Sequence, residues 1–384
     1  MRTSNGETQL LELTARRFAA QAEASGIAED QERALSLYEQ AWELGMVADP
    51  STAVPGFVTG VWGRGAVEGN LRPSLRVLSI LGEISAGFAA MIHAQGLACL
   101  ALDGAPVFPA RARLALGWLS EYGIPIGRRG GSAGAGMALR SASGVLYLEG
   151  TLRFLMASGS PQGYLLFARQ TDPSDGEEWA LIALDAATPG IRVEPLPERL
   201  GLRIVWMAHL HGEGIPLAPE RILLRGAEAH QRLEQIIAID WLGQAAIALG
   251  VIRRSLREAC AYAQQRYQGG RLIIDHPAVQ LLLGAAVSDQ AILEAILERH
   301  ADMSLKAIRH DVLLRWAATA KLAIGEHAYR AVTNSMQVLG GYGYMEDYGF
   351  AGRLRDVATL RTLHGAPDPI RMVLAESLRT EVRA

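Results

Sequence analysis

The chain has 384 residues, of which 49% are hydrophobic and 20% are charged, and its formal net charge is -3. This length can bury a large core without disulfides or metal ions, and we expect it to divide into two or three packed units. The basic residues are almost all arginine and are spread along the chain, so a nucleic-acid partner is not expected.

The two cysteines, Cys99 and Cys260, stand far apart in apolar surroundings, so free thiols and a cytoplasmic location are expected. The first residues lack the basic start and apolar run of a secretory signal. The longest apolar run, residues 236–252, contains two polar side chains and is short for a membrane span, which predicts a buried core helix. The predicted bundle has no Glu-x-x-His pair and no His-x-x-x-His pair on one helix face, so no metal site is predicted.

The amino-terminal part has the pattern of helices. Apolar residues recur at three- and four-residue intervals over residues 7–116, and Gly45 is a plausible stop for the second helix. Residues 76–93 and 110–118 continue this pattern after loops rich in glycine and proline. We therefore predict an α-helical domain over residues 1–119.

The pattern changes at Tyr122. Short apolar runs are separated by turn residues such as Ser143-Gly144 and Pro189-Gly190, which predicts a small antiparallel β domain over residues 120–226. The runs lie at residues 145–150, 164–169, 179–184 and 222–224. The glycine-rich segment 127–136 has no following helix, so we interpret it as a surface loop and not as a phosphate-binding turn.

Helical periodicity returns in the last part of the chain. It covers residues 229–265, 277–299, 304–339 and the segment from 353 onward, with a break near 365–369. Four long helices in succession predict a bundle over residues 227–384 whose neighbours pack antiparallel. The predicted fold class is α+β: an N-terminal helical domain, a middle antiparallel β domain and a C-terminal four-helix bundle.

Two motifs in the predicted bundle point to a nucleotide. Arg266-Tyr-Gln-Gly-Gly-Arg271 ends one helix, and Gln337-Val-Leu-Gly-Gly-Tyr-Gly-Tyr344 ends another. A guanidinium at a helix end can pair with pyrophosphate, and the glycines Gly340 and Gly341 let backbone amides approach a ligand closely. A solvated arginine and a helix-capping glycine pair are the alternatives for each motif alone. Both motifs at this spacing favour a site for flavin-adenine dinucleotide (FAD).

These motifs and the domain order resemble the acyl-CoA dehydrogenase family, along almost the whole chain. The first motif is similar to the family's Arg-x-x-Phe-Gly-Lys/Arg signature with Gly269 in place of phenylalanine, and the second matches Gln-x-x-Gly-Gly-x-Gly-Tyr without departure. The resemblance implies an FAD flavoprotein that desaturates an acyl-CoA or acyl-carrier thioester. It also implies a homo- or hetero-dimer or tetramer with a homologous subunit, and an electron-transfer flavoprotein as a candidate acceptor.

Other positions depart from the family. Phe154 keeps the aromatic residue of the strand that lines the flavin ring, but Met156 stands where a threonine hydroxyl bonds that ring. In the glycine-rich loop before this strand, Gly131-Ser132 alone survives of the family pattern. The positions that would line the flavin ring are therefore altered, whereas the bundle motifs are retained. For the retained residues, Arg266 and Gln337 with the following glycine pair, the resemblance implies binding of the adenine and pyrophosphate half of FAD.

The position of the family's catalytic base is also altered. His364 stands where the commonest family pattern has a glutamate; an imidazole with a pKa of about 6.5 can act as a base, and a packing histidine is the alternative. Some branches of the family place the base on the first bundle helix, which corresponds here to Asp240. The alternative for Asp240 is a salt bridge to a bundle arginine. Of the two candidates, Asp240 ranks ahead of His364.

Three functions remain open at this stage. Family members bind FAD across a dimer interface, and the retained residues are those that one subunit lends to its neighbour, as a non-catalytic subunit of a heteromer would show. The alternative is a self-sufficient acyl-CoA dehydrogenase that uses Asp240 or His364. A flavin monooxygenase of the same superfamily ranks third.

Overall fold

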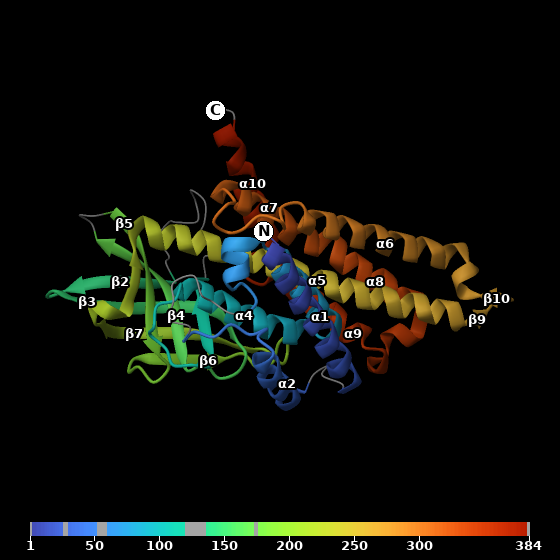
Figure 1. Ribbon diagram of the computed structural model, residues 1–384, viewed down its shortest axis with the longest axis horizontal. Helices are drawn as coiled ribbons and strands as arrows, with labels where there is room; N and C mark the ends of the chain where they lie inside the picture. The colour runs from blue at the N-terminus through green and yellow to red at the C-terminus, as the bar shows by residue number, and fades with distance from the viewer. Residues whose placement is uncertain (1, 26–29, 52–59, 120–135, 173–175, 382–384) are drawn as a thin grey trace.

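The computed structural model describes residues 2–25, 30–51, 60–119, 136–172 and 176–381. Helices lie on one side of an eight-stranded sheet and extend away from it as a long bundle, so the sheet and the bundle tip occupy opposite ends of the molecule (Figure 1). This arrangement confirms the predicted α+β class.

The described amino-terminal part contains the α-helices α1 (Arg2–Ser25), α2 (Gln31–Glu43), α3 (Arg72–Ile84) and α4 (Ala86–Leu102). The Asp30 carboxylate caps α2, and Gly45, with φ +72°, follows its end as predicted. The single helix predicted over residues 76–93 is instead two helices. Ser85 is extended between them, and its hydroxyl accepts the backbone N–H of Phe88 and so caps α4.

The sheet contains the strands predicted for the middle domain. Its order is β6-β7-β3-β1-β4-β5-β8, and β2 pairs with β3 and β4. The strands are β1 (Leu114–Gly117), β2 (Met137–Ala142), β3 (Val145–Ala157), β4 (Gly163–Asp172), β5 (Gly176–Asp185), β6 (Ile191–Pro195), β7 (Trp206–Leu217) and β8 (Ile222–Arg225).

Two predictions about this region were wrong. Residues 110–118 were predicted to be helical, but Leu114–Gly117 is strand β1, because a short apolar run has no decisive period and pairing with β3 and β4 determines its conformation. The sheet is also not purely antiparallel, since β4 runs parallel to β1 and β2. The glycine-rich segment with Gly131-Ser132 lies outside the described residues.

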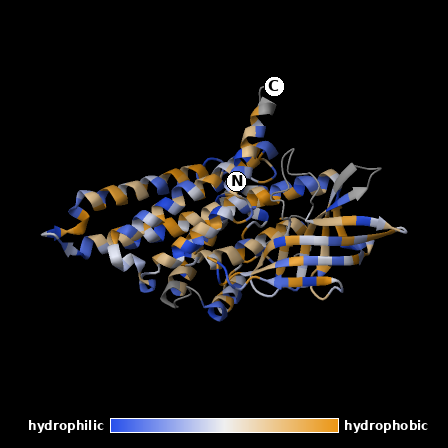
Figure 2. Cartoon of the chain, turned by 180° about the vertical axis from the view of Figure 1, so that it is seen from behind, coloured by the Kyte–Doolittle hydropathy of each residue, from blue (hydrophilic) through white to orange (hydrophobic). Residues whose placement is uncertain are grey.

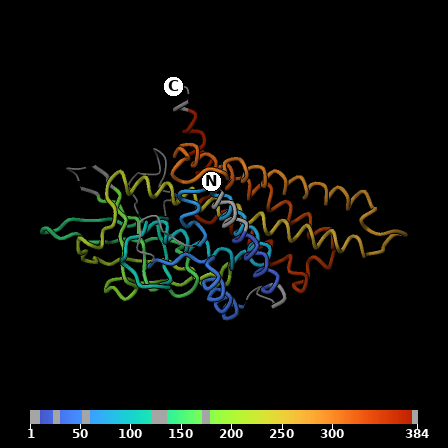
Figure 3. The backbone as a smooth tube through the Cα atoms, in the orientation of Figure 1, coloured from blue at the N-terminus to red at the C-terminus, as the bar shows by residue number. Residues whose placement is uncertain are grey.

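The carboxy-terminal helices are α5 (Gly226–Gln265), α6 (Pro277–Glu298), α7 (His310–Ala323), α8 (Tyr329–Val338), α9 (Phe350–Thr362) and α10 (Pro367–Glu381). One π-helical turn, Ile324–Ala328, joins α7 to α8, so most of the helix predicted over residues 304–339 is continuous. The short strands β9 (Tyr267–Gln268) and β10 (Arg271–Leu272) form a hairpin between α5 and α6. Figure 3 shows α5 running from the sheet to this hairpin at the bundle tip.

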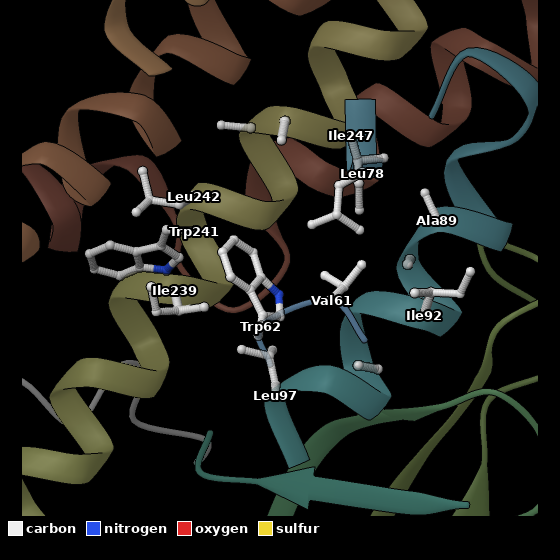
Figure 4. Packing of buried hydrophobic residues seen from close by; sticks show 14 of the residues in the cluster. Val61, Trp62, Leu78, Ala89, Ile92, Leu97, Ile239, Trp241, Leu242 and Ile247 are labelled. Atoms are coloured by element: carbon white, nitrogen blue, oxygen red, sulfur yellow. The ribbon is translucent and has the colours of Figure 1, made fainter. Parts of the chain in front are cut away.

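The core lies where α4 and α5 meet. Every residue of α4 is buried, and so are residues 236–252 of α5, as predicted for a core helix. Trp62 and Trp241 both lie in this core, among aliphatic side chains from α3, α4 and α5 (Figure 4). Among the described residues, two helices are long and apolar enough to span a membrane, but the apolar window of α5 is 94% buried, whereas that of α6 is 17% buried. α5 is therefore a core helix and α6 a surface helix.

Candidate functional site

Asp240 is completely buried in the middle of α5. Its carboxylate accepts hydrogen bonds from His93 Nε2 at 3.0 Å, His364 Nδ1 at 2.9 Å and Gln244 Nε2 at 2.7 Å. These three donors come from α4, from the turn after α9 and from the next turn of α5. The carboxylate is therefore saturated with partners from three parts of the chain.

The two histidines on Asp240 have different protonation states, which their partners define. Trp62 Nε1 donates to His93 Nδ1 at 2.8 Å, so His93 is neutral and carries its proton on Nε2. His364 faces an acceptor with each ring nitrogen: Asp240 through Nδ1, and the Phe154 carbonyl through Nε2 at 2.9 Å. Both nitrogens must donate, so His364 is an imidazolium paired with the Asp240 carboxylate.

A buried lysine extends the same set of contacts. Lys321 of α7 donates from Nζ to Gln244 Oε1 at 2.5 Å and to the carbonyl oxygens of Leu360 and Leu363 at 2.6 Å. The two carbonyls lie at the C-terminal end of α9, where a helix favours a positive charge. We call these contacts the Asp240 network; its side chains are Trp62, His93, Asp240, Gln244, Lys321 and His364.

The electrostatics of this network hold Asp240 in its charged form. Burial alone would raise the pKa of Asp240, but the charge and hydrogen bond of His364, together with His93, outweigh burial and hold that pKa well below its usual range. Burial lowers the pKa of Lys321 to about 7, although the Asp240 carboxylate acts in the opposite direction. A carboxylate with so low a proton affinity is a weak base.

The shifted lysine predicts how stability changes with pH. Because the pKa of Lys321 is lower in the folded chain than the ~10.4 of unfolded lysine, the unfolded state binds more protons between about pH 7 and pH 10. The free energy of unfolding should therefore rise with pH, by at most about 1.4 kcal/mol per pH unit from this group. In Lys321→Met this contribution disappears. Urea unfolding at pH 7 and pH 9 should show a larger gain for the wild type than for the variant; parallel changes would contradict the shift.

Large side chains fill the space around the network. Trp62 is fully buried, and the Trp118 ring packs edge-on against His364 with the ring centres 4.7 Å apart. A Cβ on Gly243 of α5 would lie 2.2 Å from the His93 ring, so only glycine there allows the imidazole to reach Asp240. None of the four main cavities in the described part of the chain is lined by Asp240 or His364.

Strand β3, which was predicted to line a flavin ring, is hydrogen-bonded to the Asp240 network through His364. Phe154 has φ +56° at an irregularity of β3, its carbonyl accepts from His364, and its ring packs edge-on against His209. Met156 is 4% exposed, pairs across the sheet with Leu116 and offers no hydrogen-bond donor. Met156 thus offers no donor to a flavin ring, whereas the Phe154 ring is 37% exposed, and the flavin role of these two residues stays a prediction.

The predicted nucleotide-binding residues lie together at the bundle tip, far along α5 from Asp240. Arg266 ends α5, and its guanidinium lies 5.9 Å from the centre of the Tyr342 ring, directly after the glycine pair. We call this group the Arg266 corner; it consists of Arg266, Gln337, Gly340 and Gly341, all of which are exposed.

The Arg266 corner fits the adenine and pyrophosphate half of FAD. Gly340 has φ +58°, and a Cβ added to Gly340 or Gly341 would meet nothing within 4 Å, so the backbone there is open to a ligand. A cavity of about 700 Å³ lies beside it between α5, α9 and the α3–α4 junction. Tyr262 and Tyr348 line that cavity and pack against Tyr342. The flavin role of these four residues stays a prediction.

Comparisons with known proteins agree with this architecture. Residues 235–379 match the family model described as acyl-CoA dehydrogenase, C-terminal domain. An acyl-CoA dehydrogenase of Bacillus subtilis is 25% identical over 62% of this chain and 62% of its own length. The short-chain specific acyl-CoA dehydrogenase of Megasphaera elsdenii is 26% identical over 63% of this chain and 62% of its own length.

Solved structures agree over almost the whole chain. The butyryl-CoA dehydrogenase of Megasphaera elsdenii has a TM-score of 0.79 with 20% identity and covers 97% of both chains. The carboxy-terminal part of the chain matches the acyl-CoA dehydrogenase family model, and the chain as a whole has the fold of these enzymes. A nitroalkane oxidase structure has a TM-score of 0.81 with 17% identity, covering 97% of this chain and 95% of that one. The fold is thereby defined, whereas activity and substrate do not follow from these matches, because the chain spans about 62% of the length of the two relatives named above.

Sequence reasoning missed four members of the Asp240 network: Trp62, His93, Gln244 as a ligand of Asp240, and Lys321. The sequence contains signals for two of them, His93 and Lys321. His93 and Gln95 are the two strongly polar side chains in the otherwise apolar α4. Lys321, one of two lysines in the chain, stands in an apolar stretch of α7. A polar group in such a position needs a buried partner.

Proposed function

We propose that this chain is a non-catalytic subunit of a mixed acyl-CoA dehydrogenase. In this role the Arg266 corner binds the adenine and pyrophosphate half of an FAD whose ring lies in a homologous subunit, and that subunit desaturates the acyl thioester. When bound in such an enzyme, FAD accepts the hydride from the substrate. The residues of this chain hold the nucleotide and support the partner's pocket.

The observation that carries this proposal is the pairing of the two candidate bases with each other. His364 donates from both ring nitrogens and has no free lone pair to accept a proton. Asp240 accepts three hydrogen bonds, is 0% exposed and has a depressed pKa. In this arrangement neither side chain can remove a proton from a thioester, which disfavours a self-sufficient enzyme based on either residue.

The Arg266 corner supports the other half of the proposal. Its four residues are exposed at the tip of a long bundle, where no other described part of the chain covers them. An arginine held over a tyrosine ring beside an open diglycine turn offers a charged fork and free backbone amides to a phosphate. In this proposal the chain keeps the side of the site that serves a neighbour, whereas Met156 on its own ring side offers no donor to a flavin.

Flavin stoichiometry tests the proposal. The full chain purified alone should retain little FAD, whereas the complex with a co-encoded homologue should hold about one FAD for each pair of chains. Flavin absorbance against protein concentration, with the subunit ratio from denaturing gels, gives this number. One FAD per chain in the isolated protein, with thioester oxidation, would instead establish the self-sufficient dehydrogenase.

A further inference from the structure

A cavity of about 660 Å³ lies beside α10, apart from both the Asp240 network and the Arg266 corner. We call it the α10 cavity; residues 296–300 at the end of α6, 312–319 of α7 and 374–378 of α10 line it. Figure 1 shows α10 projecting from the side of the bundle, and Figure 2 shows both hydrophobic and hydrophilic colours along this helix. A cavity of this size can hold a small ligand.

The ionisable side chains that line the α10 cavity are all basic: Arg299, His300 and Arg315. Each of the other three main cavities contains at least one carboxylate. Among the described residues no carboxylate pairs with Arg299. Arg315 lies 3.5 Å from Asp311, whose carboxylate also accepts two shorter hydrogen bonds from Arg309. A cavity lined by one sign of charge favours an anionic ligand.

His300 gives a second sign of the positive charge in this cavity. Burial and the neighbouring charge of Arg299 lower the pKa of His300, so its imidazole is mainly neutral at pH 7. Its ring packs edge-on against Trp316 with the ring centres 5.5 Å apart, and the Trp316 indole N–H donates to the carbonyl of Ile296 at 2.6 Å. The two rings are thus held in place beside the arginines, where a cationic ligand would be repelled.

The remaining lining residues suit an aliphatic chain with a compact head group. Aliphatic side chains come from all three segments: Ile296, Val312, Leu374 and Leu378. The two hydroxyl groups in the lining, on Thr319 and Ser377, donate to backbone carbonyls of their own helices and so do not donate to a ligand. A sugar or nucleotide head group needs several such polar partners, whereas a carboxylate can bind a guanidinium alone.

We propose that the α10 cavity binds an aliphatic monocarboxylate, with its carboxylate at Arg299 and Arg315 and its chain along Leu374 and Leu378. Charge-assisted hydrogen bonds fix the head group, and the aliphatic side chains remove the tail from water. The site shares no residue with the Arg266 corner or the Asp240 network. It therefore goes beyond the proposed function and does not depend on it.

Calorimetric titration of the full chain with sodium decanoate, below its micellar concentration, tests the proposal. The wild type should bind one decanoate for each chain. Decanol has the same chain without the charge and should bind at least about tenfold more weakly. Octanoate should bind about tenfold more weakly than decanoate, because each buried methylene increases the affinity about fourfold.

Two variants test the two ends of the ligand. Arg299→Ala should weaken decanoate binding at least about tenfold, and Leu378→Asn should weaken it about threefold or more. Both variants should keep the wild-type melting curve, because Arg299 is exposed and Leu378 is 59% exposed. The matched control is Arg140→Ala in strand β2, where the arginine is 68% exposed and lies outside the cavity; decanoate should bind this variant as it binds the wild type.

Equal affinities for decanoate and decanol, or wild-type decanoate affinity in Arg299→Ala, would overturn the proposal. Absence of saturable decanoate binding would also overturn it. If such a chain co-sediments with anionic phospholipid vesicles, the basic residues serve a membrane surface instead. The flavin proposal is unaffected by each of these results, because FAD content decides it.

Discussion

Asp240→Ala should destabilise the fold by about 3–5 kcal/mol, because it leaves the buried charges of His364 and Lys321 without the carboxylate that compensates them. Such a loss is a large share of the 5–15 kcal/mol that is typical of a folded protein. Urea unfolding followed by circular dichroism measures it. Asp302→Asn is the matched control: its carboxylate also lies in an ion pair, with Arg72, but it is 78% exposed, so the change should stay within about 1 kcal/mol.

A double variant distinguishes a paired charge from a catalytic base. Removing both charges with Asp240→Asn and His364→Gln together should cost less than the sum of the two single changes, because neither partner is then left buried and alone. If Asp240 were the base of a self-sufficient enzyme, Asp240→Asn would abolish thioester oxidation while stability and flavin content stayed near wild type. That outcome would remove the proposed structural role of the network.

Arg266→Ala should weaken FAD binding to the mixed complex by about 10–100-fold, as expected when a charge-assisted hydrogen bond to phosphate is lost. The side chain is exposed, so the variant should fold and assemble as the wild type does. Fluorimetric titration of the flavin-depleted complex with FAD gives the affinity.

Arg309→Ala serves as the control for this experiment. Arg309 is 77% exposed and pairs with Asp311 at the start of α7, away from the bundle tip, so its loss should leave FAD affinity unchanged. Equal FAD affinities for wild type and Arg266→Ala would remove Arg266 from the site. They would also leave the Arg266 corner without its proposed role in a shared cofactor pocket.

Much of the secondary structure was predictable because it depends on neighbours along the chain. The periodicity of residues 229–265 reflects one helix, α5, and the alternating short runs of the middle domain became β3, β4, β5 and β8. The two bundle motifs are also local. Each motif can be recognised from a few consecutive residues, whereas the proximity of the two motifs depends on how α5 and α8 pack.

The state of the candidate bases depended on distant segments. Asp240 is separated by 124 residues from His364 and by 147 residues from His93. The sequence around each of these residues does not predict that they contact one another. Packing of α4, α5 and the turn after α9 places them within hydrogen-bond distance, and low solvent exposure then fixes which groups are charged. From sequence, Asp240 was assigned a base role or a salt bridge to arginine; its charged partner is a histidine.

The same distinction applies to strand β1 and to α6. Leu114–Gly117 is too short for periodicity to distinguish helix from strand. It is a strand because it pairs with β3 and β4. In α6 Leu293 and Leu297 face the core as a helical period predicts, but the carboxylates of this helix pair with arginines on α3, α5 and α8 that lie far away along the chain. Local chain geometry is encoded over a few residues, whereas burial and charge pairing arise only when remote segments meet.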